Sequence, residues 1–344
     1  MSQAAHRFDP FILREYDIRG IVGKTVHAAD ARAIGRTFGT LVKRKGGRKV
    51  ALGYDGRLSS PELAQACIEG LTASGVDVVN IGVAATPMLY FSVYHLEADG
   101  GIQITGSHNP PDYNGFKMMM GKKSFFGADI QTLGAMAGKA DWESGQGKVE
   151  KKNILDAYAQ RLLKDVKPGK KLKVAWDTGN GAVGVSIRAV VDKLPGTHFV
   201  LNEKVDGTFP AHHPDPTVPK NLEQLMAEVK KQGCDMGIAF DGDGDRIGAI
   251  DGKGRILWGD QLLVLWARDV LRERPGSTII ADVKASQVLF DEVAKYGGKP
   301  LMWKTGHSLI KAKMKELKAP LAGEMSGHMF FGGDYLGFDD AIFA

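Results

Sequence analysis

Cysteine, long apolar runs and blocks of like charge are all scarce in this sequence. There are two cysteines in 344 residues and neither has a ligand partner nearby, which argues against a disulfide framework and a thiolate metal site. No apolar run approaches the roughly 20 residues that span a bilayer, and the N-terminal residues lack the basic start and apolar core of a signal peptide. Lysine and arginine are interspersed with acidic residues at a net charge of +5, so no basic stripe indicates nucleic-acid binding. We therefore expect a cytoplasmic protein without nucleic-acid or membrane partners.

Short apolar segments alternate with amphipathic ones along the chain. Runs rich in valine, isoleucine and leucine end in glycine turns, and they predict strands at 49–56, 75–82, 100–106, 171–181, 235–245 and 277–283. A helix is expected to begin at Ser59-Ser60-Pro61-Glu62 and to bury Cys67 on its apolar stripe. A later helix carries Lys311, Lys313 and Lys315 on a face that we expect to be solvated. Alternation of this kind predicts α/β folds with largely parallel sheets.

Three similar sections can be distinguished, each with a strand that runs into an Asp/Gly turn, at 54–56, 177–181 and 241–245. The polar stretch 141–153 and the turn 251–255 are the expected seams between them. The sequence therefore predicts three consecutive α/β domains, 1–152, 153–254 and 255–344. The segments Asp55-Gly56-Arg57 and Asp177-Thr178-Gly179 are interpreted as turn and interdomain contacts.

The DGDGDR motif that begins at Asp241 is the strongest chemical signal. The two glycines allow the backbone to curl, so that Asp241, Asp243 and Asp245 converge on one point. Three ionised carboxylates together require a cation, and all-oxygen donors select Mg²⁺ or Ca²⁺. An EF-hand is excluded because Arg246 and Gly252 stand where that loop needs glycine and glutamate. The alternative is an acidic surface turn.

The segment TGSHNPPDYNGFK displays a serine on a turn after a predicted strand. Ser107 follows Gly106, lies beside His108 and precedes Lys117 by ten residues, which suits a nucleophile or a phosphorylation site. A simple turn serine is the alternative. Acyl transfer is disfavoured because the segment lacks the G-x-S-x-G elbow and no Asp–His pair stands out.

The segment GEMSGHMFF places Glu324, Ser326 and His328 at alternating positions. On a strand or extended loop these side chains would face one way, a fit for sugar hydroxyls with an imidazole for acid–base work. His307, near the start of a helix, is either a helix-capping histidine or an anion contact.

Together these segments resemble the α-D-phosphohexomutase family, and most closely its bacterial bifunctional phosphomannomutase/phosphoglucomutases. The similar segments run nearly end to end in the family's order: REYDIRG, GYDGRLSSPEL, TGSHNPPDYNGFKM, VDGTFPAHHPDP, AFDGDGDR, DVK, MWKTGHSLIK and AGEMSGH. The resemblance implies α/β domains around a central cleft, with one active-site loop from each of the first three. The family's fourth domain, with its phosphate-clamping loop, has no counterpart here. The last residues, GFDDAIFA, look like a helix abandoned after one turn, with Asp339 or Asp340 as its N-cap, so we expect a C-terminally truncated chain with reduced turnover.

The resemblance also implies roles for individual residues. Ser107 would carry the phosphoryl group, and its phosphate would complete a Mg²⁺ site made by Asp241, Asp243 and Asp245. The residues expected near the transferring phosphoryl group are Arg246, Lys117 and His108. Those expected to contact the substrate are Tyr16, Arg19, Lys284, His307, Glu324, Ser326 and His328. His328 and Lys117 would be the general acid and base.

The implied reaction interconverts hexose 1-phosphate and hexose 6-phosphate, of mannose or glucose, through a phosphoserine enzyme. A 1,6-bisphosphate is the intermediate, and glucose 1,6-bisphosphate the expected activator. We expect a monomer that acts on a small phosphosugar. Three alternatives stay open: a phosphoglucosamine mutase, a phosphatase with an aspartate nucleophile, and a non-catalytic sugar-phosphate-binding module.

Overall fold

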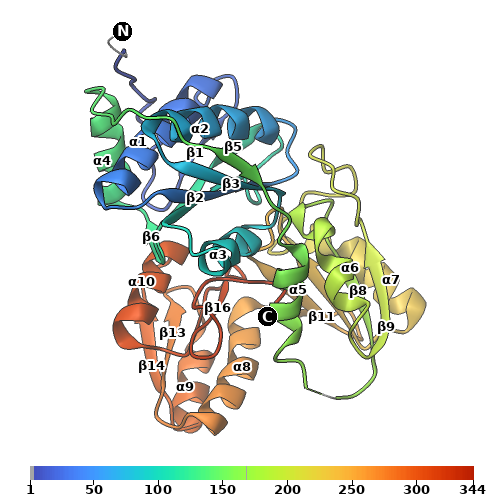
Figure 1. The fold of residues 1–344 in the computed structure, drawn as a ribbon. Coiled ribbons are helices and arrows are strands. Elements are labelled where there is room, and N and C mark those ends of the chain that lie inside the picture. The colour runs from blue at the N-terminus through green and yellow to red at the C-terminus, as the bar shows by residue number, and fades with distance from the viewer. Residues whose placement is uncertain (1–3, 168) are drawn as a thin grey trace. The chain divides into compact units, whose positions relative to one another are not determined.

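A computed structural model describes residues 4–167 and 169–344 (Figure 1). The described residues form two compact units. The first runs through Tyr158 and includes Asp206–Thr208, and the second comprises Ala159–Val205 and Phe209–Ala344. The first unit holds one sheet and the second holds two, which confirms the predicted α/β class with three mixed, largely parallel sheets. The predicted domain boundaries and the central cleft stay predictions.

The first unit is built on a seven-stranded sheet. In sheet order its strands are β1 (Ile18–Ile21), β5 (Tyr113–Met120), β4 (Gly100–Ile104), β2 (Lys49–Tyr54), β3 (Asp77–Val83) and β7 (Val149–Lys151), with β6 (Lys123–Phe125) paired to β5. The strands β4, β2, β3 and β7 are parallel, whereas β1, β5 and β6 pair antiparallel. The helices are α1 (Ala28–Arg44), α2 (Ser60–Ser74), α3 (Thr86–His95) and α4 (Ala128–Ala137). One core joins α1, α2 and α4 to the sheet, and α3 covers the opposite face (Figure 1).

The paired helices α1 and α2 approach each other unusually closely. Gly35 of α1 lies against the Cys67 carbonyl, and Gly70 of α2 lies against the Arg32 carbonyl, so that a Cβ at either glycine would overlap backbone. The helix α2 starts where its Ser-Ser-Pro-Glu signal predicts and ends at Gly75, whose φ of 96° is left-handed. Cys67 is fully buried in the core, as predicted.

Both thiols are expected to be inert in the folded protein. Cys67 and Cys234 are each less than 5% exposed, and burial raises the pKa of each thiol, so the reactive thiolate is scarce at neutral pH. A chromogenic disulfide reagent should modify neither cysteine in buffer and both in urea. Rapid modification of the native protein would contradict this.

The second unit contains a five-stranded and a four-stranded sheet. The five-stranded sheet has the order β12 (Ile256–Leu257), β11 (Ile247–Asp251), β10 (Met236–Phe240), β8 (Leu172–Asp177) and β9 (Gly196–Leu201). The four-stranded sheet has the order β14 (Lys299–Trp303), β13 (Thr278–Asp282), β15 (Leu321–Gly323) and β16 (Met329–Phe331). The helices are α5 (Leu155–Leu163, which begins in the first unit), α6 (Ile187–Val191), α7 (Glu223–Gln232), α8 (Gly259–Glu273), α9 (Gln287–Lys295) and α10 (His307–Leu317), with 3₁₀ turns at Ala182–Val185 and Pro219–Leu222.

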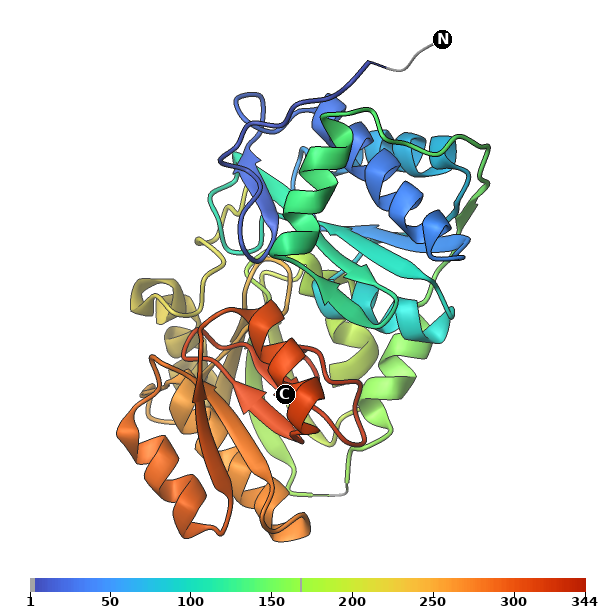
Figure 2. The same cartoon turned by 90° about the vertical axis from the view of Figure 1, so that its left-hand side faces the viewer.

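The helices α9 and α10 cover different faces of the four-stranded sheet (Figure 2). The strand β13 is parallel to both β14 and β15, which flank it. The two crossovers therefore move in opposite directions, and right-handed connections place their helices on opposite faces. Ile310 and Met314 of α10 pack into the core against Ile280 of β13. No helix among the described residues is long and apolar enough to cross a membrane.

The three chemical segments all follow strands that belong to parallel pairs. The Ser107 loop follows β4, the DGDGDR loop follows β10, and the GEMSGH segment follows β15. The carboxyl edge of a parallel sheet is where α/β proteins bind ligands. Within the predicted segments 171–181 and 235–245, β8 ends at Asp177 and β10 at Phe240, and the expected glycine turns follow.

Candidate active site

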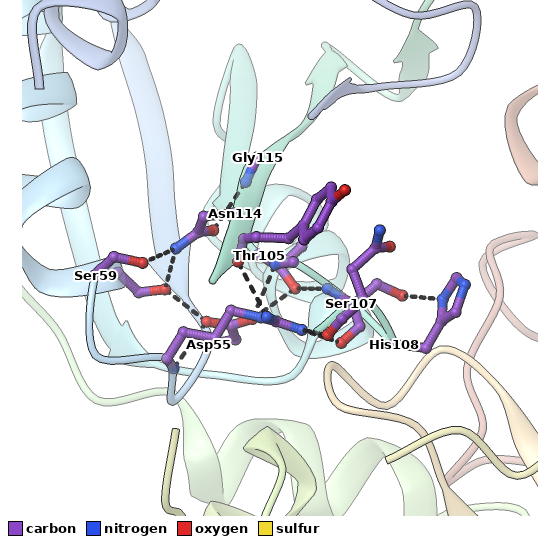
Figure 3. A network of polar contacts seen from close by, with 12 residues as sticks. Asp55, Ser59, Thr105, Ser107, His108, Asn114 and Gly115 are labelled. Atoms are coloured by element: carbon purple, nitrogen blue, oxygen red, sulfur yellow. Dashed lines mark hydrogen bonds and ion pairs between the residues drawn. The ribbon is translucent and has the colours of Figure 1, made fainter. Parts of the chain in front are cut away.

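Ser107 stands in a strained turn after β4 (Figure 3). Its φ is +50°, a left-handed conformation that costs a residue with a side chain about 1–2 kcal/mol. The Ser107 amide donates to the Thr105 hydroxyl at 2.8 Å, and its own Oγ lies 3.2 Å from Nδ1 of His108. Backbone strain of this kind persists only where surrounding contacts over-determine it. Contacts from other segments must therefore hold the Ser107 turn in this conformation.

Those contacts come from Asp55 and Arg57, which lie just after the neighbouring strand β2. The Arg57 guanidinium donates to four backbone carbonyls of the serine loop, those of Ser107, Asn109, Pro110 and Tyr113. Asp55 accepts from Arg57 Nε at 3.1 Å and from the Thr105 hydroxyl at 2.8 Å. Figure 3 shows Asp55 facing Thr105 beneath the loop.

Arg19 approaches the same loop from β1. Its guanidinium donates to the Gly106 carbonyl at 2.6 Å and to Asn109 Oδ1 at 2.8 Å. Lys117 is buried on β5, and Tyr16, just before β1, is more than a third exposed. The first unit thus brings Arg19 to the loop that carries Ser107 and His108.

The DGDGDR loop joins β10 to β11 and gathers its three carboxylates. Asp241, Asp243 and Asp245 are fully buried, and each offers an oxygen within 4.8 Å of the others. The turn is closed by Gly244, whose φ is +75° and whose amide donates to Asp241 Oδ1 at 3.0 Å. Three buried carboxylates this close together repel one another, and their oxygen donors are the ligands that a hard divalent cation prefers. We call these three residues the metal-binding cluster, as the candidate site for such a cation.

The GEMSGH segment forms a tight hairpin between β15 and β16, which corrects the extended conformation expected from the sequence. The Glu324 amide donates to the His328 carbonyl at 2.9 Å, so these two residues close the hairpin instead of alternating along a strand. The Glu324 carboxylate accepts from the Gly306 amide at 2.6 Å and from the Ser326 hydroxyl at 3.2 Å. Gly327 makes the turn possible with a φ of +92°.

The hairpin and the DGDGDR loop are in direct contact within the second unit. The Ile247 amide donates to the Gly327 carbonyl at 3.0 Å. Arg246 Nε donates to His328 Nε2 at 2.9 Å. The arginine after the aspartates and the imidazole of the hairpin are therefore one hydrogen-bonded pair.

His307 is the first residue of α10, and the N-cap is Gly306, so His307 does not cap the helix. Its Nδ1 lies 3.3 Å from Lys311 Nζ. The same nitrogen lies 3.8 Å from Asp339 Oδ2. The anion contact stays a prediction, as does the substrate contact of Lys284, which is exposed in the turn after β13.

Three segments of the chain match known domain models. Residues 11–139 match "Phosphoglucomutase/phosphomannomutase, alpha/beta/alpha domain I", residues 155–254 match domain II, and residues 258–344 match domain III. The chain belongs to the phosphoglucomutase/phosphomannomutase family.

Relatives within this family are longer than the chain. A phosphomannomutase/phosphoglucomutase of Pseudomonas aeruginosa is 47% identical over 97% of this chain and 72% of its own length. A phosphoglucomutase of Neisseria meningitidis is 45% identical over 97% of the chain and 73% of its own length. The crystal structure of a family protein from Burkholderia thailandensis superposes with a TM-score of 0.94 at 45% identity, over 98% of this chain and 75% of that one.

The sequence interpretation missed several residues that shape this mutase-family site. Asp55 and Arg57 were interpreted as turn and interdomain contacts, yet they hold the serine loop; adjacency of β2 and β4 in a parallel sheet would have predicted it. Lys311 was placed on a solvated face, but its side chain is only 10% exposed and pairs with the buried Asp339. Asp340, not Asp339, caps the C-terminal turn, through the amides of residues 342 and 343.

Replacing Arg57 by alanine should destabilise the protein by about 3–5 kcal/mol, because it leaves the buried Asp55 carboxylate without its cation. Urea unfolding measures this loss. Arg32→Ala is the control, since the Arg32–Glu69 pair is about half exposed on the surface and should cost at most about 1 kcal/mol. Equal losses in the two variants would contradict the assigned role.

Proposed function

We propose that this chain is a phosphohexomutase that interconverts the 1- and 6-phosphates of mannose or glucose, with Ser107 as the phosphoryl carrier. The observation that carries the proposal is the strained, clamped Ser107 turn in a chain 47% identical to a phosphomannomutase/phosphoglucomutase. A serine held in a costly conformation by a buried arginine is a pre-organised group. Its hydroxyl beside His108 suits it to accept and return a phosphoryl group.

The cation of this mutase would be Mg²⁺, held by Asp241, Asp243 and Asp245. When bound, it supplies positive charge that offsets the charge on phosphoryl oxygens. The positive charges of Arg246 and Lys117 would also offset the charge on the phosphoryl oxygens. Because Arg246 is also bonded to His328, its position is fixed before substrate arrives.

Substrate contacts are proposed for residues in several segments of the chain. Glu324, Ser326 and His328 would hold sugar hydroxyls, with His328 and Lys117 moving protons. The remaining contacts with the substrate are assigned to Tyr16, Arg19, Lys284 and His307. The 1,6-bisphosphate must turn end over end between its two phosphoryl transfers, which suits a site with several cations. Water must be kept away, because hydrolysis of phosphoserine leaves an enzyme without its phosphate.

A coupled assay tests this function. With Mg²⁺ and added glucose 1,6-bisphosphate, the chain should convert glucose 1-phosphate to glucose 6-phosphate, detected with a dehydrogenase specific for the 6-phosphate. Intact mass should show one added phosphoryl group on the active protein. Binding of the sugar phosphate without any isomerisation would identify a non-catalytic module instead. Faster turnover of glucosamine 6-phosphate would identify a phosphoglucosamine mutase.

A further inference from the structure

The turn after β8, residues 177–181, takes no part in the reaction proposed above, yet it is built around a buried charge. The Asp177 carboxylate is fully buried. Its Oδ1 accepts from the Gly179 amide at 2.9 Å and from Asn202 Nδ2 at 2.8 Å. Its Oδ2 lies 2.8 Å from Nε2 of His212, which belongs to the VDGTFPAHHPDP segment. One carboxylate therefore ties three segments of the second unit together.

The backbone around this carboxylate is strained. The φ angle is +55° at Gly179, +57° at Asn180 and +54° at Asn202. This left-handed conformation is costly for the two asparagines, which carry side chains. The Asn180 amide also donates to the Asn202 carbonyl at 3.0 Å. Because such strain persists only where surrounding contacts over-determine it, the bonds of Asp177 are what fix the turn.

The end of the turn lies against the DGDGDR loop. The Ala182 amide donates to the Gly242 carbonyl at 2.9 Å. Gly181 packs so closely on the same peptide that a Cβ there would lie 2.8 Å from the Gly242 oxygen. Gly242 stands between the first two aspartates of the metal-binding cluster, so the position of its peptide affects where their carboxylates point.

The contacts of His212 indicate that its ring is positively charged. Nε2 faces the Asp177 carboxylate, and Nδ1 lies 3.0 Å from the His213 carbonyl oxygen. Both partners are acceptors, so the two bonds form together only when both ring nitrogens are protonated. Burial alone would lower the pKa of the ring, but the hydrogen bond to Asp177 and the charge of that carboxylate raise the pKa above its ordinary value. The ring also lies beside Gly179, which brings no charge.

We propose that Asp177 and a positively charged His212 position the metal-binding cluster, by fixing the turn that lies against Gly242. This rests on the function proposed above only in that the three aspartates hold a divalent cation. The pair acts on them through the backbone of Gly181 and Ala182. Loss of the charge on His212 leaves the Asp177 carboxylate buried without a counter-charge, which favours rearrangement of the turn. Contacts that support metal ligands in this way change metal affinity by about 10–100-fold.

The first test concerns the charge of His212 and needs neither metal nor turnover. Nitrogen-15 NMR of the histidine-labelled chain, in EDTA at neutral pH, should show both ring nitrogens of His212 protonated. The signals are assigned by their loss in His212→Gln. In Asp177→Asn, the ring should be mostly neutral. A wild-type ring with a single protonated nitrogen would overturn the proposal, even if Asp177→Asn failed to fold.

The second test measures the affinity of the chain for Mn²⁺, which accepts oxygen ligands as Mg²⁺ does and is detected free in solution by electron paramagnetic resonance. His212→Gln keeps a hydrogen-bond donor but removes the charge, and it should raise the Kd roughly 10-fold. Gly181→Ala presses a Cβ against the Gly242 peptide and should raise the Kd by about 10–100-fold. An unchanged Kd in either variant would overturn the proposal.

Gly298→Ala is the matched control for a general loss of stability. A Cβ at Gly298 would lie 2.7 Å from the side chain of Leu271, an overlap comparable to that at Gly181 but with no contact to the DGDGDR loop. It should lower the melting temperature and leave the Kd for Mn²⁺ unchanged within about twofold. Equal rises in Kd for Gly298→Ala and Gly181→Ala would overturn the positioning role. A wild-type chain that binds no Mn²⁺ would overturn the metal site of the proposed function itself, so the two failures are distinguishable.

Discussion

Replacement of Ser107 by alanine should lower mutase turnover by at least roughly 10³-fold, because it removes the phosphoryl carrier. The loop should survive the change. Ser107 is held through its backbone, by its amide to Thr105 and by its carbonyl to Arg57, and both bonds persist without the hydroxyl. The folded variant should also carry no phosphoryl group by intact mass. The measurement is the coupled assay together with thermal unfolding.

Two further variants make this prediction specific. Ser107→Gly should be equally inactive yet no less stable than Ser107→Ala, since glycine adopts a φ of +50° without steric cost. Ser144→Ala, which changes an exposed serine of the same unit, should keep both activity and phosphate. Retained activity in Ser107→Ala would favour the phosphatase alternative, in which an aspartate of the DGDGDR loop is the nucleophile.

Local patterns were enough to predict the fold class. A strand that ends in a glycine turn, or a helix that starts with Ser-Ser-Pro-Glu, is recognised from a few adjacent residues. The helix α2 begins where the Ser-Ser-Pro-Glu segment predicts. The DGDGDR motif likewise predicts its own geometry, because its glycines and aspartates are adjacent and the turn is closed by bonds within the motif. The carboxylates meet as expected.

Contacts between distant segments could not be predicted in the same way. Nothing near residue 57 indicates that Arg57 holds a loop some 50 residues later, because this depends on β2 and β4 being neighbours in the sheet. The Lys311–Asp339 pair depends on α10 lying beside the last residues, and the helical pattern alone places that lysine on a solvated face. The hairpin at 324–328 was predicted as extended, because alternation of polar residues says nothing of the bond between Glu324 and the His328 carbonyl.

Neutralising one aspartate of the metal-binding cluster should have opposite effects on the protein without and with Mg²⁺. At 4.8 Å or less, two like charges repel by about 3–4 kcal/mol at an effective dielectric constant of 20. Asp243→Asn removes two such repulsions, so in EDTA its melting temperature should exceed that of the wild type, by about 2–4 °C for each kcal/mol relieved.

Saturation with Mg²⁺ should reverse this order. A cation at a hundredfold excess over its Kd stabilises the wild type by about 2.7 kcal/mol, whereas the variant lacks one charged ligand and should gain little. The two melting curves should therefore cross between EDTA and excess MgCl₂, and mutase activity should fall by roughly 100-fold or more, the upper end of the loss expected when a metal site is disturbed. Asp269→Asn, an exposed aspartate of α8, is the control and should follow the wild type in both conditions. If Asp243→Asn keeps the full stabilisation by Mg²⁺, the cation is held elsewhere, because a buried carboxylate cannot bind it tightly and be dispensable to that binding.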